Sequence, residues 1–366
     1  MKPVLRYTLS ALLWGIAGLY VVWSAVATRR DRTAQCVEQL RIEVTDSSAQ
    51  GYMVTGALVR KWLADNRIET VGASIDRVDL QGIEELIGRN GFVRNVRAYV
   101  TRDRMLHIEI GRRQPLLRLM TDGRNAYVTA DGYVFPAPPA SSLYVPVVTG
   151  SYRPPFPADF TGPAIDYIEQ CRAETERRIR EIELEKDMFY IQIRAMRDTL
   201  DSVRRRTVTR RWWRLESRER FDKRVEARMA EKKRYRRYRA YHTRRIENEL
   251  ARISRRQEDE RRRQKNLEKS YEDFMKLLTF VEFVEDDDFW RSEVVQIIAR
   301  ATVSGALEVE LVPRSGRHRI LFGRLEDVER KFDKLLCFYR RGLREIGWDE
   351  YSTINVKYSD QVVCKK

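Results

Sequence analysis

Residues 79–112 read DLQGIEELIGRNGFVRNVRAYVTRDRMLHIEIGR and combine one amphipathic helix with two strands. Asp79 is a residue type that caps helices, and the apolar residues after it recur at spacings of three and four. Alternating apolar residues then predict strands at 96–100 and 106–110, which the polar run Arg102-Asp103-Arg104 connects. This order predicts the second half of a small α+β domain.

The preceding residues supply the first half of that domain. Residues 40–44 alternate apolar and charged side chains, which is typical of a half-buried strand. Thr55 can cap a helix that buries apolar residues on one face. The complete β-α-α-β-β order over 36–112 predicts helices on one face of a sheet.

The N-terminal region contains an apolar segment. Residues 7–26 read YTLSALLWGIAGLYVVWSAV and carry no charge, and a helix of this length matches the hydrocarbon thickness of a bilayer. We expect a single transmembrane helix over 7–28 after a short cytoplasmic tail at 1–6. Two basic residues precede the segment and three follow it, so charge does not choose its orientation. The alternative is a signal peptide cleaved after Ala25-Val26-Ala27, which the length of the apolar run disfavours.

Residues 113–162 and 272–366 predict a mixed β domain. Asp122-Gly123 and Asp131-Gly132 supply the positive φ that tight hairpins require. Neither half makes a convincing antiparallel layer alone, so both are expected in one sheet, with a C-terminal helix on the apolar stripe of 325–346. The expected strands before the last one are 116–120, 125–129, 133–135, 144–148, 293–301, 307–312 and 318–322.

A basic helical insertion over 163–271 separates the two halves. The chain has 70 Lys and Arg against 54 Asp and Glu, a net charge of +16, and residues 171–270 alone carry +15 of it. No Gly or Pro occurs between Ala164 and Ser304, which favours long helices. The sequence therefore predicts an α+β protein whose β domain is interrupted by a coiled-coil-like insertion.

Apolar residues of the insertion recur at intervals of three, four and seven, which predicts a seam for another helix. The seam is expected to reverse at Thr207-Val208-Thr209, although one bent helix remains the alternative. The expected seam residues are Ile179, Ile182, Phe189, Ile193, Met196, Leu200 and Val203, followed by Phe221, Val225 and Met229.

Aromatic and basic residues are interleaved in the second half of the insertion. We call Arg234, Tyr235, Arg237, Tyr238 and Tyr241 the basic-aromatic patch. Such a pattern is typical of a solvated face on a packed helix, or of a surface for anionic lipid or an envelope polyanion. Nucleic acid fits the chemistry but is disfavoured outside the cytoplasm.

Sequence signatures of common enzymes are missing. No GxxxxGK[ST], GxGxxG, GxSxG or HExxH motif occurs, and the four cysteines and three histidines lack metal-binding spacing. We therefore expect no catalytic residue, no cofactor and no metal site.

The order of segments resembles the bacterial cell division family FtsQ/DivIB, whose first exported unit is a POTRA domain. The short motifs that carry the resemblance are Phe92-Val93, Arg112-Arg113-Gln114-Pro115-Leu116, Thr129 to Phe135, Leu311 to Gly316, Ile320 to Gly323, Lys331-Phe332-x-x-Leu335, Phe338-Tyr339 and Gly347-Trp348-x-x-Tyr351-x-x-Ile354-Asn355-Val356-x-Tyr358-x-x-Gln361-Val362-Val363. The likeness covers 1 to about 160 and 272–366 and leaves the insertion outside the family pattern.

The resemblance implies a non-enzymatic scaffold of the divisome, the cell division assembly. Its members bind the single-span proteins FtsB and FtsL, so strand addition is expected at an edge strand over Ile354 to Val363. Lys357 and Tyr358 fall where the family's partner-binding strand carries a basic residue and a Tyr, and pattern alone adds Val356 and Val362. The expected location is the cell inner membrane at the division septum, with a cytoplasmic N-terminus and a periplasmic C-terminal bulk.

Two other functions fit parts of the sequence. A POTRA-type outer-membrane assembly or secretion factor is one alternative, but no series of barrel strands follows. The other is a membrane-tethered basic coiled-coil protein that binds anionic polymers or nucleic acid.

Overall fold

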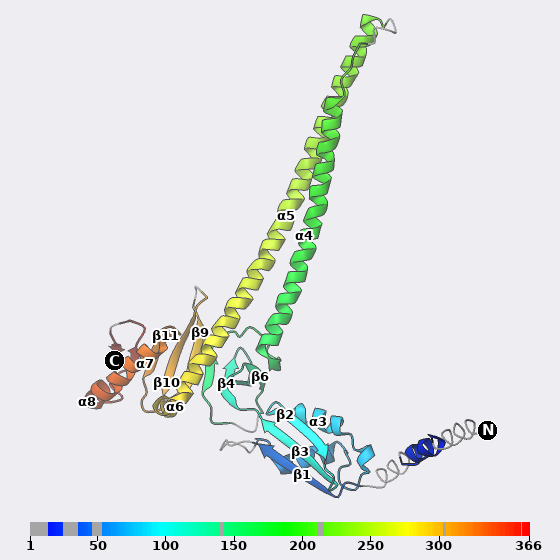
Figure 1. Cartoon of the computed structure of the whole chain (residues 1–366). Helices are drawn as coiled ribbons and strands as arrows, with labels where there is room; N and C mark the ends of the chain where they lie inside the picture. Colours follow the sequence, from blue (N-terminus) through cyan, green and yellow to red (C-terminus); the bar gives the residue numbers. More distant parts are fainter. Residues whose placement is uncertain are drawn as a thin grey trace, which may run out of the picture. The chain divides into compact units, whose positions relative to one another are not determined.

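The computed structural model describes residues 14–24, 36–45, 53–138, 143–210, 216–302, 305–359 and 361–366 (Figure 1). The chain divides into two compact units. The first comprises Met1–Arg153, Ala158–Gly162 and Leu278–Lys366, and the second comprises Pro154–Pro157 and Pro163–Leu277.

Only part of the N-terminal segment is described. Residues 14–24 are helical. No helix of the described ranges combines the length and apolar character needed to cross a membrane. Half of the predicted span over 7–28 lies outside the described residues, as does all of the predicted tail at 1–6.

The predicted β-α-α-β-β domain is confirmed by β1 (Gln39–Thr45), α2 (Gly56–Asp65), α3 (Leu80–Gly88), β2 (Val93–Val100) and β3 (Met105–Arg112). Central β3 pairs in parallel with β1 and antiparallel with β2. Both predicted caps are present, because Thr55 Oγ1 accepts from Leu58 N at 3.2 Å and Asp79 Oδ1 accepts from Gly82 N at 2.9 Å. Each cap satisfies a backbone N–H that has no partner within its own helix.

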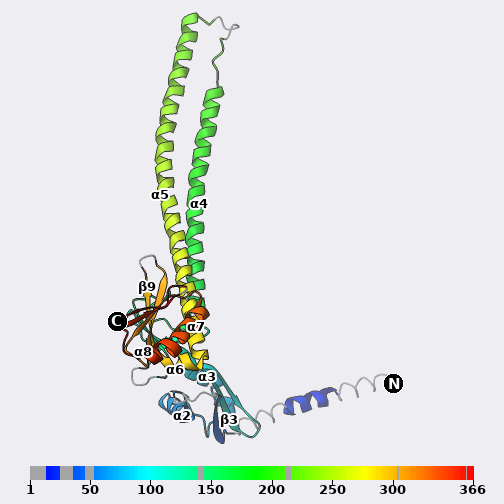
Figure 2. The ribbon, with the colours of Figure 1, turned by 90° about the vertical axis from the view of Figure 1, so that its left-hand side faces the viewer.

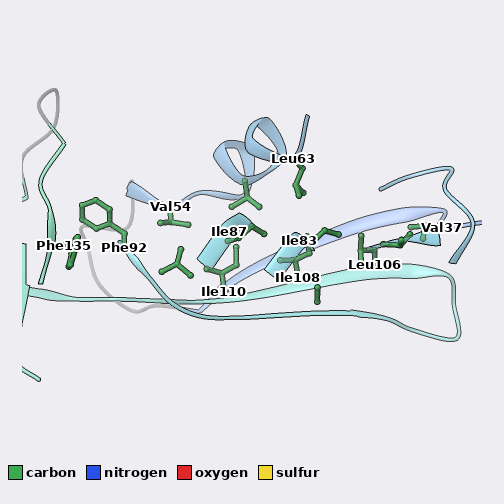
Figure 3. Close-up of a cluster of buried hydrophobic side chains, with 14 of the residues drawn as sticks. Val37, Val54, Leu63, Ile83, Ile87, Phe92, Leu106, Ile108, Ile110 and Phe135 are labelled. Carbon is green, nitrogen blue, oxygen red and sulfur yellow. The ribbon is translucent and has the colours of Figure 1, made fainter. Parts of the chain in front are cut away.

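The core of this domain lies between α3 and β3 (Figure 3). Leu106, Ile108 and Ile110 alternate along β3 and are completely buried, as are Ile83 and Ile87 on α3. Side chains two residues apart share one face of a strand, and side chains four residues apart share one face of a helix, so these residues form one apolar layer.

The same core extends into the next sheet. Phe92 and Phe135 lie edge to face with ring centroids 4.9 Å apart, in a geometry that aromatic pairs favour. A Cβ at Gly91 would lie 2.7 Å from the Cβ of Phe135, so only glycine leaves room for this contact.

The second sheet contains both halves of the β domain. Among the described residues its order is β13-β12-β11-β10-β9-β7-β4-β5-β6-β8. Its strands are β4 (Pro115–Thr121), β5 (Ala126–Thr129), β6 (Tyr133–Pro136), β7 (Val147–Gly150), β8 (Gly162–Pro163), β9 (Val294–Ala301), β10 (Leu307–Pro313), β11 (Arg319–Arg324), β12 (Thr353–Asn355) and β13 (Val363–Lys365).

Strands β7 and β9 connect the two halves by parallel pairing, which confirms the predicted common sheet. Gln296 Nε2 donates to Thr149 Oγ1 at 2.7 Å across this pair. Gly150 has a φ of +114°, and a Cβ there would lie 2.2 Å from the Ala299 carbonyl oxygen. Glycine therefore permits the close approach of the two backbones.

Several sequence predictions of local structure are confirmed and one is displaced. Asp122 and Gly123 have φ of 52° and 75°, and Gly132 has φ of 76°, as the predicted turns require. The strand predicted at 144–148 begins later, as β7 at Val147–Gly150. Pro146, just before the paired residues, has no N–H to donate to a neighbouring strand. The predicted C-terminal helix comprises α7 (Val328–Phe338), a π turn (Tyr339–Leu343) and α8 (Arg344–Ile346).

The second unit is a helical hairpin formed by α4 (Ala164–Arg205) and most of α5 (Arg218–Asp286) (Figures 1 and 2). The residues of α5 after Leu277 belong to the first unit. Residues 206–210 are not helical, so the predicted reversal is confirmed over one bent helix. Ile182, Ile246 and Ile253 are buried between the two helices. Polar contacts also cross the interface, since Gln257 Nε2 donates to Glu183 Oε1 at 3.0 Å.

The prediction that Met229 belongs to the seam is wrong. Its side chain is 66% exposed. Arg228 takes the inward position instead and donates from Nη2 to the Val203 carbonyl at 2.9 Å. The aliphatic stem of an arginine can cover apolar surface while its head binds a carbonyl at the end of a helix.

Candidate functional site

The candidate site is the edge of the second sheet at β12 and β13. Parallel pairing joins β12 to β11, and antiparallel pairing joins β12 to β13. The predicted continuous edge strand from Ile354 to Val363 is therefore wrong. The segment forms two short strands, and β13 occupies the side of β12 that was expected to be open.

Side chains from other elements hold the chain where it leaves β12. Lys334 of α7 donates from Nζ to the Val356 carbonyl at 3.3 Å and also to the Tyr358 carbonyl. Lys357 Nζ lies 2.5 Å from Glu308 Oε2 of β10, and its backbone N–H donates to Asn355 Oδ1 at 3.0 Å. These contacts turn the backbone away from a continued strand.

The four predicted partner-binding residues have different surroundings. Val356 is completely buried, so its side chain belongs to the core and is not accessible to a partner. Lys357 forms the ion pair with Glu308, while Tyr358 is 52% exposed and Val362 is half-buried. Tyr358 thus lies at the surface and not in the core.

Sequence reasoning missed β13 as the terminal strand of the sheet. The exposed side chain of Val363 and the half-buried side chain of Cys364 lie on this strand. On its far side β13 has no paired strand among the described residues, so an edge remains one strand further out. The short apolar run Val362-Val363-Cys364 was the available sequence signal, but three residues are too few for it to stand out.

A buried polar cluster supports this end of the domain. His318 Nε2 lies 2.8 Å from the Tyr339 hydroxyl, and the Glu293 carboxylate accepts from Ser315 N at 3.3 Å. Burial lowers the pKa of His318, against the opposing effects of the Trp348 backbone and the Glu293 and Asp349 carboxylates. Burial also raises the pKa of Tyr339, so both side chains are neutral at physiological pH.

The basic-aromatic patch is split by the fold of the hairpin. Tyr235 is directed to the seam, where its hydroxyl donates to the Met196 carbonyl at 3.4 Å. Arg234, Arg237, Tyr238 and Tyr241 are exposed instead. Four of the five predicted residues therefore share a solvent-facing surface, and the fifth stabilises the helix pair.

The junction motif Arg112 to Leu116 has a structural role. The backbone N–H of Arg113 donates to the Phe92 carbonyl at 2.8 Å, and its guanidinium lies 3.2 Å from the ring centroid of Tyr133. Partial burial lowers the pKa of Arg113. This cation–π contact connects the two sheets of the first unit.

Two family models match the chain. Residues 34–111 match the POTRA-like domain, and residues 261–365 match the description "FtsQ/DivIB, C-terminal related". Among curated proteins, no relative matches. The first match covers the β-α-α-β-β domain, and the second covers the strands from β9 to β13 with α7. Together with the fold, these matches identify the chain as an FtsQ/DivIB-like POTRA protein.

Proposed function

We propose that this protein is a non-enzymatic scaffold of the cell division machinery that binds single-span division proteins similar to FtsB and FtsL. The FtsQ/DivIB-like and POTRA-like domains suggest a division-related scaffold. The scaffold is anchored by the N-terminal apolar segment in the cell inner membrane and exposes both domains on the periplasmic side of the septum. Its partners bind by strand addition at the C-terminal sheet.

The observation that supports strand addition is the terminal place of β13. In the described structure β13 pairs with β12 on one side and with no strand on the other. An edge strand presents unpaired N–H and C=O groups that an extended segment of another protein can bind. Val363 of β13 is exposed, as is Tyr358 in the connection between β12 and β13, and both can contribute side-chain specificity.

Two features of β13 limit nonspecific pairing at this edge. The strand has three residues, and Lys365 and Lys366 place positive charge at its end. Short edge strands with lysine resist nonspecific pairing. A partner segment with acidic residues near its pairing register would bind better than a neutral one.

The binding test is recovery of the partners with the full chain in detergent. Val363→Glu and Tyr358→Glu are expected to reduce recovery of FtsB- and FtsL-like partners at least about tenfold, because each places charge where the added strand packs. Val71→Glu, at an equally exposed site of the POTRA-like domain, is the matched control and should recover the partners normally. Normal recovery with both edge variants would reject strand addition at this edge.

Location is tested separately. A fluorescent full-length fusion should be enriched at midcell in dividing cells, and a reporter fused after Lys366 should be active only outside the cytoplasm. A reporter active only in the cytoplasm would reject the exported scaffold.

A further inference from the structure

The solvent-facing side of α5 carries a basic and aromatic stripe. We call Arg234, Arg237, Tyr238, Tyr241, Arg244 and Arg245 the outer stripe. Successive members are three residues apart or adjacent, which places them on one face of a helix. All six are exposed, whereas Tyr235 and Ile246 on the opposite side contact or face α4.

The arginines of the outer stripe differ from those nearer the base of the hairpin. Arg252, Arg262 and Arg263 each form an ion pair with a glutamate one turn away. Residues 232–246 contain eight Lys and Arg and no Asp or Glu. Within the described hairpin, none of the four stripe arginines forms an ion pair.

Such a concentration of like charge is unfavourable for an isolated helix. Like charges at i,i+3 and i,i+4 destabilise a helix, and the effect is relieved when an anion binds them. Guanidinium groups also bind carboxylates and phosphates through paired hydrogen bonds. The charge pattern therefore points to an anionic ligand with several charged groups along its length.

The tyrosines add flat apolar surface between these charges. Tyr238 and Tyr241 are 54% and 67% exposed. The ring of His242 lies beside both, with centroid distances of 4.2 Å to Tyr238 and 5.3 Å to Tyr241. Exposed rings at this spacing can pack against ring-shaped units of a ligand.

We propose that the outer stripe binds a linear acidic sugar polymer whose units carry carboxylate or phosphate groups. This proposal rests on the export of the hairpin in the proposed function. The stripe contains no Leu, Phe or Trp, which an interfacial helix needs for insertion into a bilayer. Lys233 and Arg236, also exposed, extend the positive charge around the helix. A flexible polymer can curve around the helix and contact these residues together with the stripe, whereas a flat membrane surface contacts one side only.

The test measures fluorescence anisotropy of labelled alginate oligomers, a carboxylated sugar polymer, with the full chain in detergent at increasing salt. Changing the four stripe arginines to Gln should weaken binding roughly 100-fold and reduce its salt dependence, because counterion release falls with each lost contact. The matched control changes Arg252, Arg255, Arg262 and Arg263 to Gln, which removes equal charge from exposed sites of α5.

Two further comparisons identify the ligand class. Tyr238→Ala with Tyr241→Ala should weaken alginate binding about fivefold without changing its salt dependence, while Tyr190→Ala at an exposed site of α4 should not. Uncharged dextran should not bind. Tighter binding of oligodeoxythymidylate, binding only to phosphatidylglycerol vesicles, or equal losses in the two arginine variants would overturn the proposal. These affinities do not depend on cellular location, so a failure of alginate binding and a failure of export are measured separately.

Discussion

His318 shows how one buried side chain connects acidity to stability. It is 1% exposed and contacts the Tyr339 hydroxyl at 2.8 Å. Burial lowers its pKa in the folded chain, so the folded state binds its proton less readily than the unfolded state, whose histidine pKa is about 6.5. The stabilising contribution is complete above that value and is lost as the pH falls through the lower folded pKa.

We predict that His318→Gln flattens this dependence. Glutamine is neutral at every relevant pH, so the variant should lose less stability than the native chain between about pH 7 and pH 5, even if it is less stable at neutral pH. Urea unfolding of the two proteins across that range measures the difference. His242→Gln, in the hairpin, is the control and should keep the native dependence. Parallel pH profiles for His318→Gln and the native chain would contradict the assignment.

At the residue scale, the sequence predicted what depends on near neighbours. Thr55 and Asp79 cap their helices three residues away, and this local geometry is visible in the sequence. Pattern alone placed Val356 among the partner-binding residues, and this was wrong, because Val356, like Ile354, is completely buried. The pattern also did not show that β12 ends at Asn355, because Lys334 binds the Val356 carbonyl from 22 residues away.

At the scale of elements, the hairpin depends on inward residues of both helices. Ile253 is 3% exposed, and the polar contact between Gln257 and Glu183 lies one turn further along α5. The spacing of three and four predicted the inward face of α4, where Ile182 is buried and the other predicted residues are half-buried. It failed at Met229 because the seam of α5 includes polar residues, which apolar spacing alone does not show.

Replacing two residues of α5 tests this assignment. Ile253→Ala should destabilise the hairpin by about 2–4 kcal/mol, because it removes buried methyl groups and leaves a cavity. Met229→Ala should change stability by less than about 0.5 kcal/mol, since the side chain is largely exposed. Thermal loss of the helical circular dichroism signal of the full chain measures both. A larger effect at Met229 than at Ile253 would show that the seam is wrongly assigned.

At the scale of the whole chain, the second sheet is continuous although the insertion interrupts its sequence. The Gln296 and Thr149 side chains are hydrogen-bonded to each other although they are 147 residues apart in the sequence. The sequence predicted this common sheet for two reasons. The stretch without Gly or Pro marked the insertion, and neither flanking segment had enough strands to form a sheet alone. The edge at β13 was not predicted, since the pairing of a three-residue strand depends on partners supplied by the folded sheet.

Shortening the hairpin separates the two proposed interactions. Replacing Thr175–Lys265 by a short Gly-Ser turn removes the outer stripe and keeps the base of both helices, including buried Phe274. Since the pairing of β7 with β9 lies wholly within the first unit, the sheet should fold and partner recovery should persist, while alginate binding should be lost. Near-ultraviolet circular dichroism reports the packing of Trp290 and its aromatic neighbours, and recovery and anisotropy report the interactions. Loss of partner recovery with intact packing would place a partner-binding surface on the hairpin, and retained alginate binding would place the polymer site outside it.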